Sequence, residues 1–219
     1  MSAKIFVPTA GATDWRRLLA KPETQWRDGF SAKCAAERWE ASAGWPPEVA
    51  RQFELAGWGP TEALVAFPEW KTPLPGGDRA SQTDIFALVR ARIGVVACGV
   101  EAKVSESFDR TIAEWSLDAS PGKRERLAFL CKLLGLEDPP PATLRYQLFH
   151  RTGAALIEAQ RFGCAGAAMI VHSFSAEKMW FDDFQSFAAA LGVAVTPEAP
   201  AVATVGGVPL LLGWASAAP

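Results

Sequence analysis

Long apolar segments are missing from this sequence. No uninterrupted apolar run approaches the length of a membrane-spanning helix, and the opening residues, MSAKIFVPTAGATDWRR, lack the apolar stretch of a secretory signal. Hydrophobic residues make up 49% and charged residues 21% of the 219 positions, as in a globular protein with a sizeable core. The sequence therefore predicts a single globular domain in the cytoplasm.

Disulfide and metal-binding patterns are scarce as well. The four cysteines are scattered without a CxxC pair, which favours buried thiols in a reducing compartment over disulfides or a zinc site. With only two histidines, His150 and His172, the chain has no histidine cluster. The formal net charge is −2, so any contact with nucleic acid has to use a local basic patch. No internal repeat, GxGxxG, GxSxG or P-loop motif is present.

The stretch from Thr83 to Val104 stands out instead. It is rich in Val, Ile, Phe and Ala, which predicts two β-strands joined by a tight turn. If the turn lies between Arg92 and Ile93, the numbers of antiparallel partners sum to 185, and Asp84 lies opposite Glu101. The few polar residues of this hairpin therefore meet at one of its ends.

Chemistry is expected at that end of the hairpin. Side chains alternate between the faces of a strand, so Glu101 and Lys103 share one face while Ala102 points away. The carboxylates of Asp84 and Glu101 would repel each other unless a cation lies between them, which makes this end of the hairpin a candidate functional site. The alternative is a solvated strand edge, because Glu-x-Lys is a common tripeptide.

The remaining elements follow from hydrophobic periodicity and from helix start and stop signals, and their order predicts an α/β fold with a mixed sheet. Six tryptophans in the first 70 residues indicate a densely packed layer or a subunit interface. Helices are expected over 14–21, 31–44, 47–55, 144–162 and 180–191, helical structure over 105–136 with a break at 120–122, and strands over 62–70, 165–174 and 208–216.

A third acid is expected from the helix over 31–44, for which Ser31 is a suitable N-cap. Glu40 lies at the border of the apolar stripe of this helix, and Glu37 lies far from its centre. We therefore expect Glu40 to point toward Asp84 and Glu101, and Glu37 to point to solvent. An ordinary surface position is the alternative for Glu40.

This layout resembles the PD-(D/E)XK nuclease-like superfamily, which has the restriction-endonuclease-like fold. The resemblance covers roughly residues 31–175 and depends on Asp84, on the Glu101-x-Lys103 motif and on Glu40, less well Glu37, with Thr83 where the superfamily name implies Pro. The segments WRDGFSAK, WEASAGWPPEV, VEAKVSESF, YQLFHRTGAAL and IVHSFS are more closely similar to a bacterial family of uncharacterised proteins.

The resemblance implies a single domain over 1–219, with the core at about 31–175. An N-terminal helical, Trp-rich extension would cover 1–30, and a C-terminal helix and strand would cover 176–219. A central mixed β-sheet flanked by helices is the expected architecture.

It also implies a nuclease or phosphodiesterase that acts on nucleic acid with Mg²⁺, or Mn²⁺ in its place. Asp84, Glu101 and the backbone carbonyl of Ala102 would hold the metal, with Glu40 as a further catalytic acid and Lys103 beside the attacking water. Gln147, Arg151 and His150 would contact the substrate phosphate. For His150 the alternative is a structural hydrogen bond at the end of a mostly buried helix.

A second class of function stays open at this point. The tryptophan-rich first third and the acidic character of the chain favour a non-catalytic, homo-oligomeric binding or interaction protein, a dimer for example, built on the same fold. The presence of Asp84, Glu101 and Lys103 together favours the metal-dependent enzyme.

Overall fold

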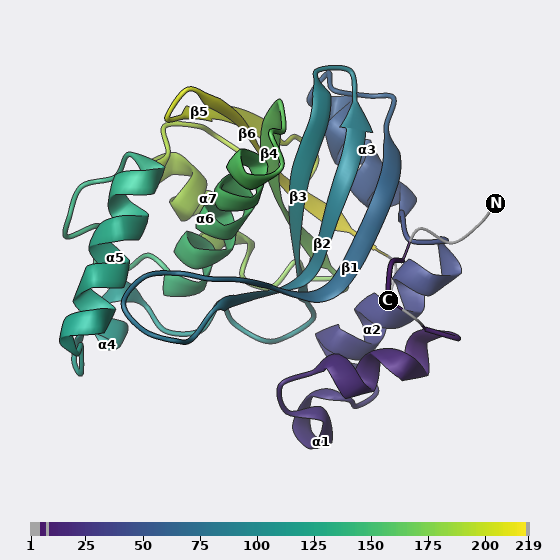
Figure 1. The fold of residues 1–219 in the computed structure, drawn as a ribbon, viewed down its shortest axis with the longest axis horizontal. Coiled ribbons are helices and arrows are strands. Elements are labelled where there is room, and N and C mark those ends of the chain that lie inside the picture. Colours follow the sequence, from purple (N-terminus) through teal and green to yellow (C-terminus); the bar gives the residue numbers. More distant parts are fainter. Residues whose placement is uncertain (1–4, 8, 218–219) are drawn as a thin grey trace.

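The computed structural model describes residues 5–7 and 9–217 and contains one six-stranded mixed β-sheet with helices on both faces, in the strand order β1-β2-β3-β4-β6-β5 (Figure 1). The expected α/β class is therefore confirmed. The strands are β1 (Glu62–Thr72), β2 (Ser81–Ala91), β3 (Gly94–Lys103), β4 (Gly166–Ser173), β5 (Ala201–Val205) and β6 (Val208–Ser216).

The β2–β3 hairpin has the register that its sequence predicts. Paired residue numbers sum to 185 from Ala91↔Gly94 to Ile85↔Val100, and the chain reverses at Arg92 and Ile93. Successive side chains of a strand point to opposite faces of the sheet. A shift of the register by one residue would therefore turn every buried side chain to the other face, which is why the register is well defined. The register therefore places Asp84 directly beside Glu101 at the end of the ladder.

The centre of the sheet is parallel. β3 pairs with β4, and β4 pairs with β6, so that Lys103, Ser173 and Ser216 end three neighbouring strands at the same edge. Every residue of β4 is buried, as expected for a strand covered on both faces. β6 lies inside this sheet between β4 and β5, so the C-terminal strand is part of the central layer. The short strand β5 was not predicted from the sequence.

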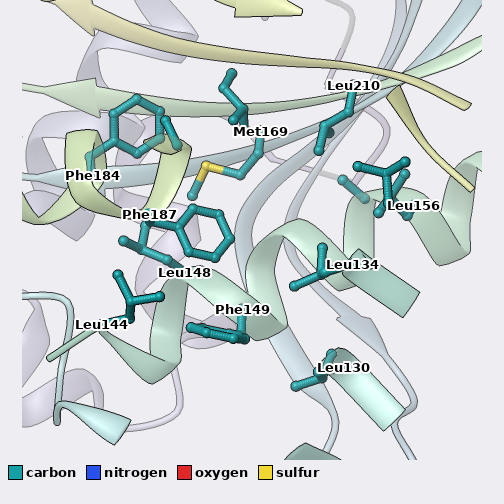
Figure 2. Close-up of a cluster of buried hydrophobic side chains, with 14 of the residues drawn as sticks. Leu130, Leu134, Leu144, Leu148, Phe149, Leu156, Met169, Phe184, Phe187 and Leu210 are labelled. Atoms are coloured by element: carbon teal, nitrogen blue, oxygen red, sulfur yellow. The ribbon is translucent and has the colours of Figure 1, made fainter. Parts of the chain in front are cut away.

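Two helical layers cover the sheet, one on each face (Figure 1). Side chains of α5, α6 and α7 build one core, which Figure 2 shows around Phe149, Phe187 and Met169. Trp39 and Phe53 are among the large buried side chains of the core on the opposite face. The helices are the 3-10 helix η1 (Ala12–Leu18) and the α-helices α1 (Pro22–Gln25), α2 (Ser31–Ala41), α3 (Pro47–Leu55), α4 (Ile112–Ser116), α5 (Pro121–Leu134), α6 (Tyr146–Arg161) and α7 (Phe181–Ala190).

Several local expectations were wrong. The segment from 105 to 111 is not helical, and α4 begins only after Thr111, whose hydroxyl and the Glu114 carboxylate form a capping box. Ser31 does not cap α2 with its side chain. Its amide and hydroxyl both donate to Glu106 Oε1, at 3.0 Å each, and this bond ties α2 to the segment after β3.

Three of the N-terminal tryptophans have a packing role. Trp39 is fully buried, and Trp15 and Trp58 are 3% and 6% exposed, all within the core beneath α2 and α3. These three side chains therefore stabilise the fold and are not available to a subunit interface. In the described parts of the chain, no helix combines the length and the apolar character needed to cross a bilayer.

Candidate functional site

Three carboxylates lie in a row across the first three strands. The β1–β2 register, in which Pro68 pairs with Ile85 and Trp70 with Thr83, puts Glu69 beside Asp84. The β2–β3 register puts Asp84 beside Glu101. Asp84 is thus the middle member of an acidic row at the edge where the parallel strands β3, β4 and β6 end, which is the usual position of ligand sites in α/β sheets.

Glu69 is the acid that the sequence analysis missed. Its backbone has φ 55°, in the left-handed region that a residue with a Cβ adopts only at a cost of about 1–2 kcal/mol. Its Oε2 accepts a hydrogen bond of 2.6 Å from Gln82 Nε2. Strained backbone of this kind often accompanies functional positions, and here it directs an acid into the site.

Glu101 is held by three donors. Lys103 Nζ donates to Oε1 at 2.9 Å, Gln147 Nε2 donates to the same oxygen at 2.7 Å, and Arg151 Nε donates to Oε2 at 2.5 Å. The Glu101 side chain is only 3% exposed. Burial alone would raise its pKa, but Arg151 and Lys103 outweigh burial and hold the pKa of Glu101 well below its usual range. Glu101 is therefore ionised throughout the physiological range.

Asp84 and Glu69 have the opposite electrostatic character. Burial and the charge of Glu101 raise the pKa of Asp84 to about 7. Burial and the charge of Asp84 raise the pKa of Glu69 to about 8. Near neutral pH Glu69 is therefore largely protonated and Asp84 is about half protonated unless a cation reaches them, which is the behaviour of an incompletely compensated acidic site.

Asp84 is fixed by the backbone of β3. Its Oδ2 accepts a 2.8 Å hydrogen bond from the amide of Ala102, and its Oδ1 lies 3.9 Å from Arg151 Nη2. The side chain is 23% exposed, so a small ligand can reach it. Asp84 and Glu101 thus share Arg151 as a cationic neighbour, which confirms their expected proximity.

Lys103 lies deep in the same cluster. Its Nζ contacts Glu101 Oε1, donates to Gln147 Oε1 at 3.0 Å and sits 5.0 Å from the ring centroid of Phe108. The residue is 4% exposed. The buried stem and fixed head of Lys103 give the cluster one cation of well-defined position.

The cluster opens into a cavity of about 380 Å³, which we call the acidic cavity. Glu106 also lines it, and the bonds of that carboxylate to Ser31 hold α2 over the cavity. The full lining consists of Leu19, Thr24, Gln25, Phe30, Ser31, Ala32, Glu69, Asp84, Glu101, Lys103, Glu106, Gln147 and Arg151.

The expectation for Glu40 was wrong. Its Oε1 accepts hydrogen bonds from Thr9 Oγ1 at 3.0 Å and from Trp15 Nε1 at 2.8 Å. It is not among the residues that line the acidic cavity. Glu37 does point to solvent, with a side chain that is 58% exposed and 3.7 Å from Lys33. The border position of Glu40 brings it to the N-terminal segment, and Glu69 occupies the place expected for the third acid.

The polar residues of α6 divide into two groups. Gln147 and Arg151 face the acidic cluster, as expected. His150 makes no hydrogen bond to the acidic cluster. Its Nδ1 instead lies 2.8 Å from Ser81 Oγ, within hydrogen-bonding distance. Burial and the neighbouring charge of Arg151 lower the pKa of His150 well below its ordinary value. These contacts therefore support a structural hydrogen bond for His150, which was the alternative to a contact with the substrate phosphate.

The metal-ligating capacity of the site depends on few groups. Within residues 5–7 and 9–217, no group of three or more His, Cys, Asp or Glu side chains is arranged to hold a metal ion. Both oxygens of Glu101 already accept hydrogen bonds, so Asp84 and Glu69 are the two acids of the row that can offer an oxygen to a metal ion. A cation at this site would have to complete its shell with backbone oxygen and water.

The fold and this cluster define an α/β protein whose mixed sheet carries a carboxylate, lysine and arginine cluster at the ends of its parallel strands. The chain belongs to the family described as a domain of unknown function (DUF6946), whose model matches residues 8–219. No curated protein and no solved structure gives a significant match to the chain.

Proposed function

We propose that this protein is a Mg²⁺- or Mn²⁺-dependent phosphodiesterase of the PD-(D/E)XK type that cleaves nucleic acid. The observation that carries the proposal is the placement of Asp84, Glu101 and Lys103 in one cavity, with Glu69 beside them. Carboxylates, a fixed ammonium group and a guanidinium group around one cavity match the needs of phosphoryl chemistry, which are a cation seat and positive charge near the phosphate.

The donor set fits a hard divalent cation. Within the part of the chain that the structure describes, Asp84 Oδ1 and one oxygen of Glu69 receive no hydrogen bond. The Ala102 amide donates to Asp84 Oδ2 on β2. The N–H and C=O groups of one strand residue point to the same side of the strand, so the Ala102 carbonyl also faces Asp84. Two carboxylate oxygens, one carbonyl and several waters are a normal shell for Mg²⁺.

The chain's own residues would then divide the work. A bound cation supplies Lewis acidity and lowers the pKa of water in its shell. Lys103 would orient a water and neutralise charge that builds on the phosphate, while Glu101 and Gln147 hold its ammonium group in place. Arg151 would donate a hydrogen bond from Nη2 to a phosphate oxygen, and this nitrogen lies 3.9 Å from Asp84 Oδ1. The four buried or half-buried thiols fit a reducing compartment, so we place this activity in the cytoplasm.

A calorimetric titration with Mg²⁺ and Mn²⁺, followed by a cleavage assay on single- and double-stranded DNA and RNA, tests the proposal. We expect binding in the micromolar to millimolar range and cleavage only with metal. Asp84→Asn should abolish both, because it removes a charged ligand. Lys103→Met should abolish cleavage and retain metal binding, because an ammonium group has no free acceptor. Cleavage that survives chelation would refute the proposal.

One observation favours a second candidate. Glu101 is fully engaged by Lys103, Gln147 and Arg151, so these four residues already form a satisfied network without any ligand. Such a network can stabilise a non-catalytic interaction protein that forms homo-oligomers. The absence of metal binding at millimolar concentration, together with a stable dimer in solution, would favour this candidate.

A further inference from the structure

A second cavity, of about 460 Å³, lies on the other side of Arg151, and we call it the basic cavity. Arg151 lines both cavities, so the two adjoin at this residue. Ser81 and His150 form part of the wall of the basic cavity. The loop between β1 and β2 supplies another part of this wall, and Figure 1 shows that loop reaching across to α4 and α5.

The wall of this cavity carries an excess of positive charge. Four cationic side chains line it against two acidic ones, in a chain with a net charge of −2. The cationic residues are Arg79, Lys123, Arg126 and Arg151, and the acidic ones are Asp78 and Asp109. A local basic patch is the feature that nucleic-acid binding requires of an acidic chain.

Two of these cations keep uncompensated charge. Arg126 donates to the carbonyl oxygens of Pro75 at 2.8 Å and Gly77 at 3.1 Å, which are neutral acceptors. Arg79 is exposed on the same loop and has no hydrogen bond or ion pair within the described parts of the chain. By contrast, Lys123 is already paired with Asp118 at 2.6 Å. Arg79 and Arg126 are therefore the groups that an anion in this cavity would meet.

The cavity wall is held in place before any ligand binds. Gly76 has φ +79°, and a Cβ built there would lie 2.0 Å from the carbonyl oxygen of Gly122. Only glycine therefore lets the loop pack directly onto the start of α5. The bonds from Arg126 fasten the same loop to α5. Binding would therefore need little ordering of the loop backbone and of Arg126.

We propose that the basic cavity binds a phosphate group of the nucleic-acid strand next to the phosphodiester held at the acidic cavity. The strand would run across Arg151, with one phosphate near Asp84 and Lys103 and the neighbouring one against Arg79 and Arg126. This inference rests on the proposed function and extends it, because it assigns the side of Arg151 on which the substrate continues. Phosphate contacts of this kind position a strand without reading its sequence.

Binding of a fluorescent single-stranded oligonucleotide to the whole chain, measured by anisotropy in EDTA over a series of salt concentrations, tests the inference. Arg79→Gln removes one phosphate contact, so we expect affinity to fall about 5-fold at 0.1 M salt and the salt slope to shrink by about 0.7. Arg51→Gln is the control, because Arg51 is an exposed arginine on α3 at the opposite face of the sheet. Its affinity should equal that of the wild type.

The outcomes separate this inference from the proposed function. If Arg79→Gln weakens binding but wild-type protein never cleaves with metal, the phosphate site stands and the proposed nuclease function fails. If the wild type cleaves and Arg79→Gln binds as tightly as the wild type, the phosphate site is overturned alone. Equal losses for Arg79→Gln and Arg51→Gln, or Arg79-dependent binding of a mononucleotide without binding of the oligonucleotide, would overturn it too.

Discussion

Arg151 on α6 donates from Nε to Glu101 Oε2 on β3 at 2.5 Å, and both side chains are nearly buried, at 10% and 3% exposure. The two residues are fifty positions apart in the chain. A buried ion pair of this kind adds little net stability, but removal of one partner leaves the other charge buried with less compensation. Their pairing thus couples the packing of α6 on the sheet to the integrity of the site.

Loss of the Arg151 charge should strongly destabilise the fold. Arg151→Met leaves Glu101 with Lys103 as its one cationic partner, so we expect the free energy of unfolding in urea to fall by about 3–5 kcal/mol. Arg90→Gln is the control, because Arg90 and Glu62 form a pair with 65% and 50% exposed side chains, and it should cost under about 1 kcal/mol. Equal effects of the two substitutions would contradict the assignment of Glu101 as a buried charge.

Glu69 and Glu40 should differ sharply in their effect on metal binding. Glu69→Gln removes a carboxylate from the acidic cavity, so we expect Mn²⁺ affinity to fall at least 10-fold in a calorimetric titration. Glu40→Gln should leave the affinity unchanged within 2-fold, about 0.4 kcal/mol, because that carboxylate bonds to Thr9 and Trp15. The reverse order would show that the metal is held on the α2 side of the site.

The raised pKa of Glu69 predicts a pH-dependent stability of the metal-free protein. The folded state keeps this proton up to a pKa of about 8, while the unfolded chain releases it near the ordinary pKa of 4.5 for a glutamate. The folded state therefore binds more protons between these values, and the free energy of unfolding should fall as pH rises through this window, by up to about 1.4 kcal/mol per unit.

Glu69→Gln removes this proton uptake and should flatten the decline, with a gain in stability at pH 8.5 relative to the wild type. Urea unfolding in EDTA between pH 5 and 8.5 measures it, and the exposed Glu37→Gln variant serves as the control. A wild-type stability that rises over this range with the same slope in both variants would contradict the prediction.

The contact between Gly76 and Gly122 predicts a site-specific cost of adding one methyl group. Gly76→Ala should destabilise the protein by more than Gly192→Ala, for which we expect about 1–2 kcal/mol. The two glycines have φ +79° and +80°, but a Cβ at Gly192 meets nothing within 4 Å. Thermal unfolding of both variants measures the difference. Similar melting temperatures would mean that the loop moves aside at little cost.

The hairpin shows how far local sequence patterns reach. A two-residue turn fixes the register of its strands, and alternation fixes their faces, so the proximity of Asp84 and Glu101 follows from counting. The contacts of Gln147 and Arg151 with this cluster join residues 46 and 50 positions apart, and they were expected from the resemblance. The register and faces of the hairpin, by contrast, depend on residues that are close in sequence.

Glu69 illustrates the limit of such counting. The β1–β2 connection from 73 to 80 is too long to fix a register, and the left-handed backbone at Glu69 leaves no signal in the composition of its strand. A helical wheel could not predict the contacts of Glu40 either. It gives the position of a residue around the helix axis, but it does not show which segment of the chain packs against that position.

The sequence by itself determined the α/β class, the β2–β3 register and the placement of Asp84, Glu101 and Lys103 on one face. Only the tertiary structure decided that Glu69 completes the acidic row, that Glu40 bonds to Trp15 and that a basic cavity adjoins the site at Arg151. The reason is physical: hairpin register and side-chain alternation are properties of the local backbone, whereas contacts between distant segments depend on how whole layers pack.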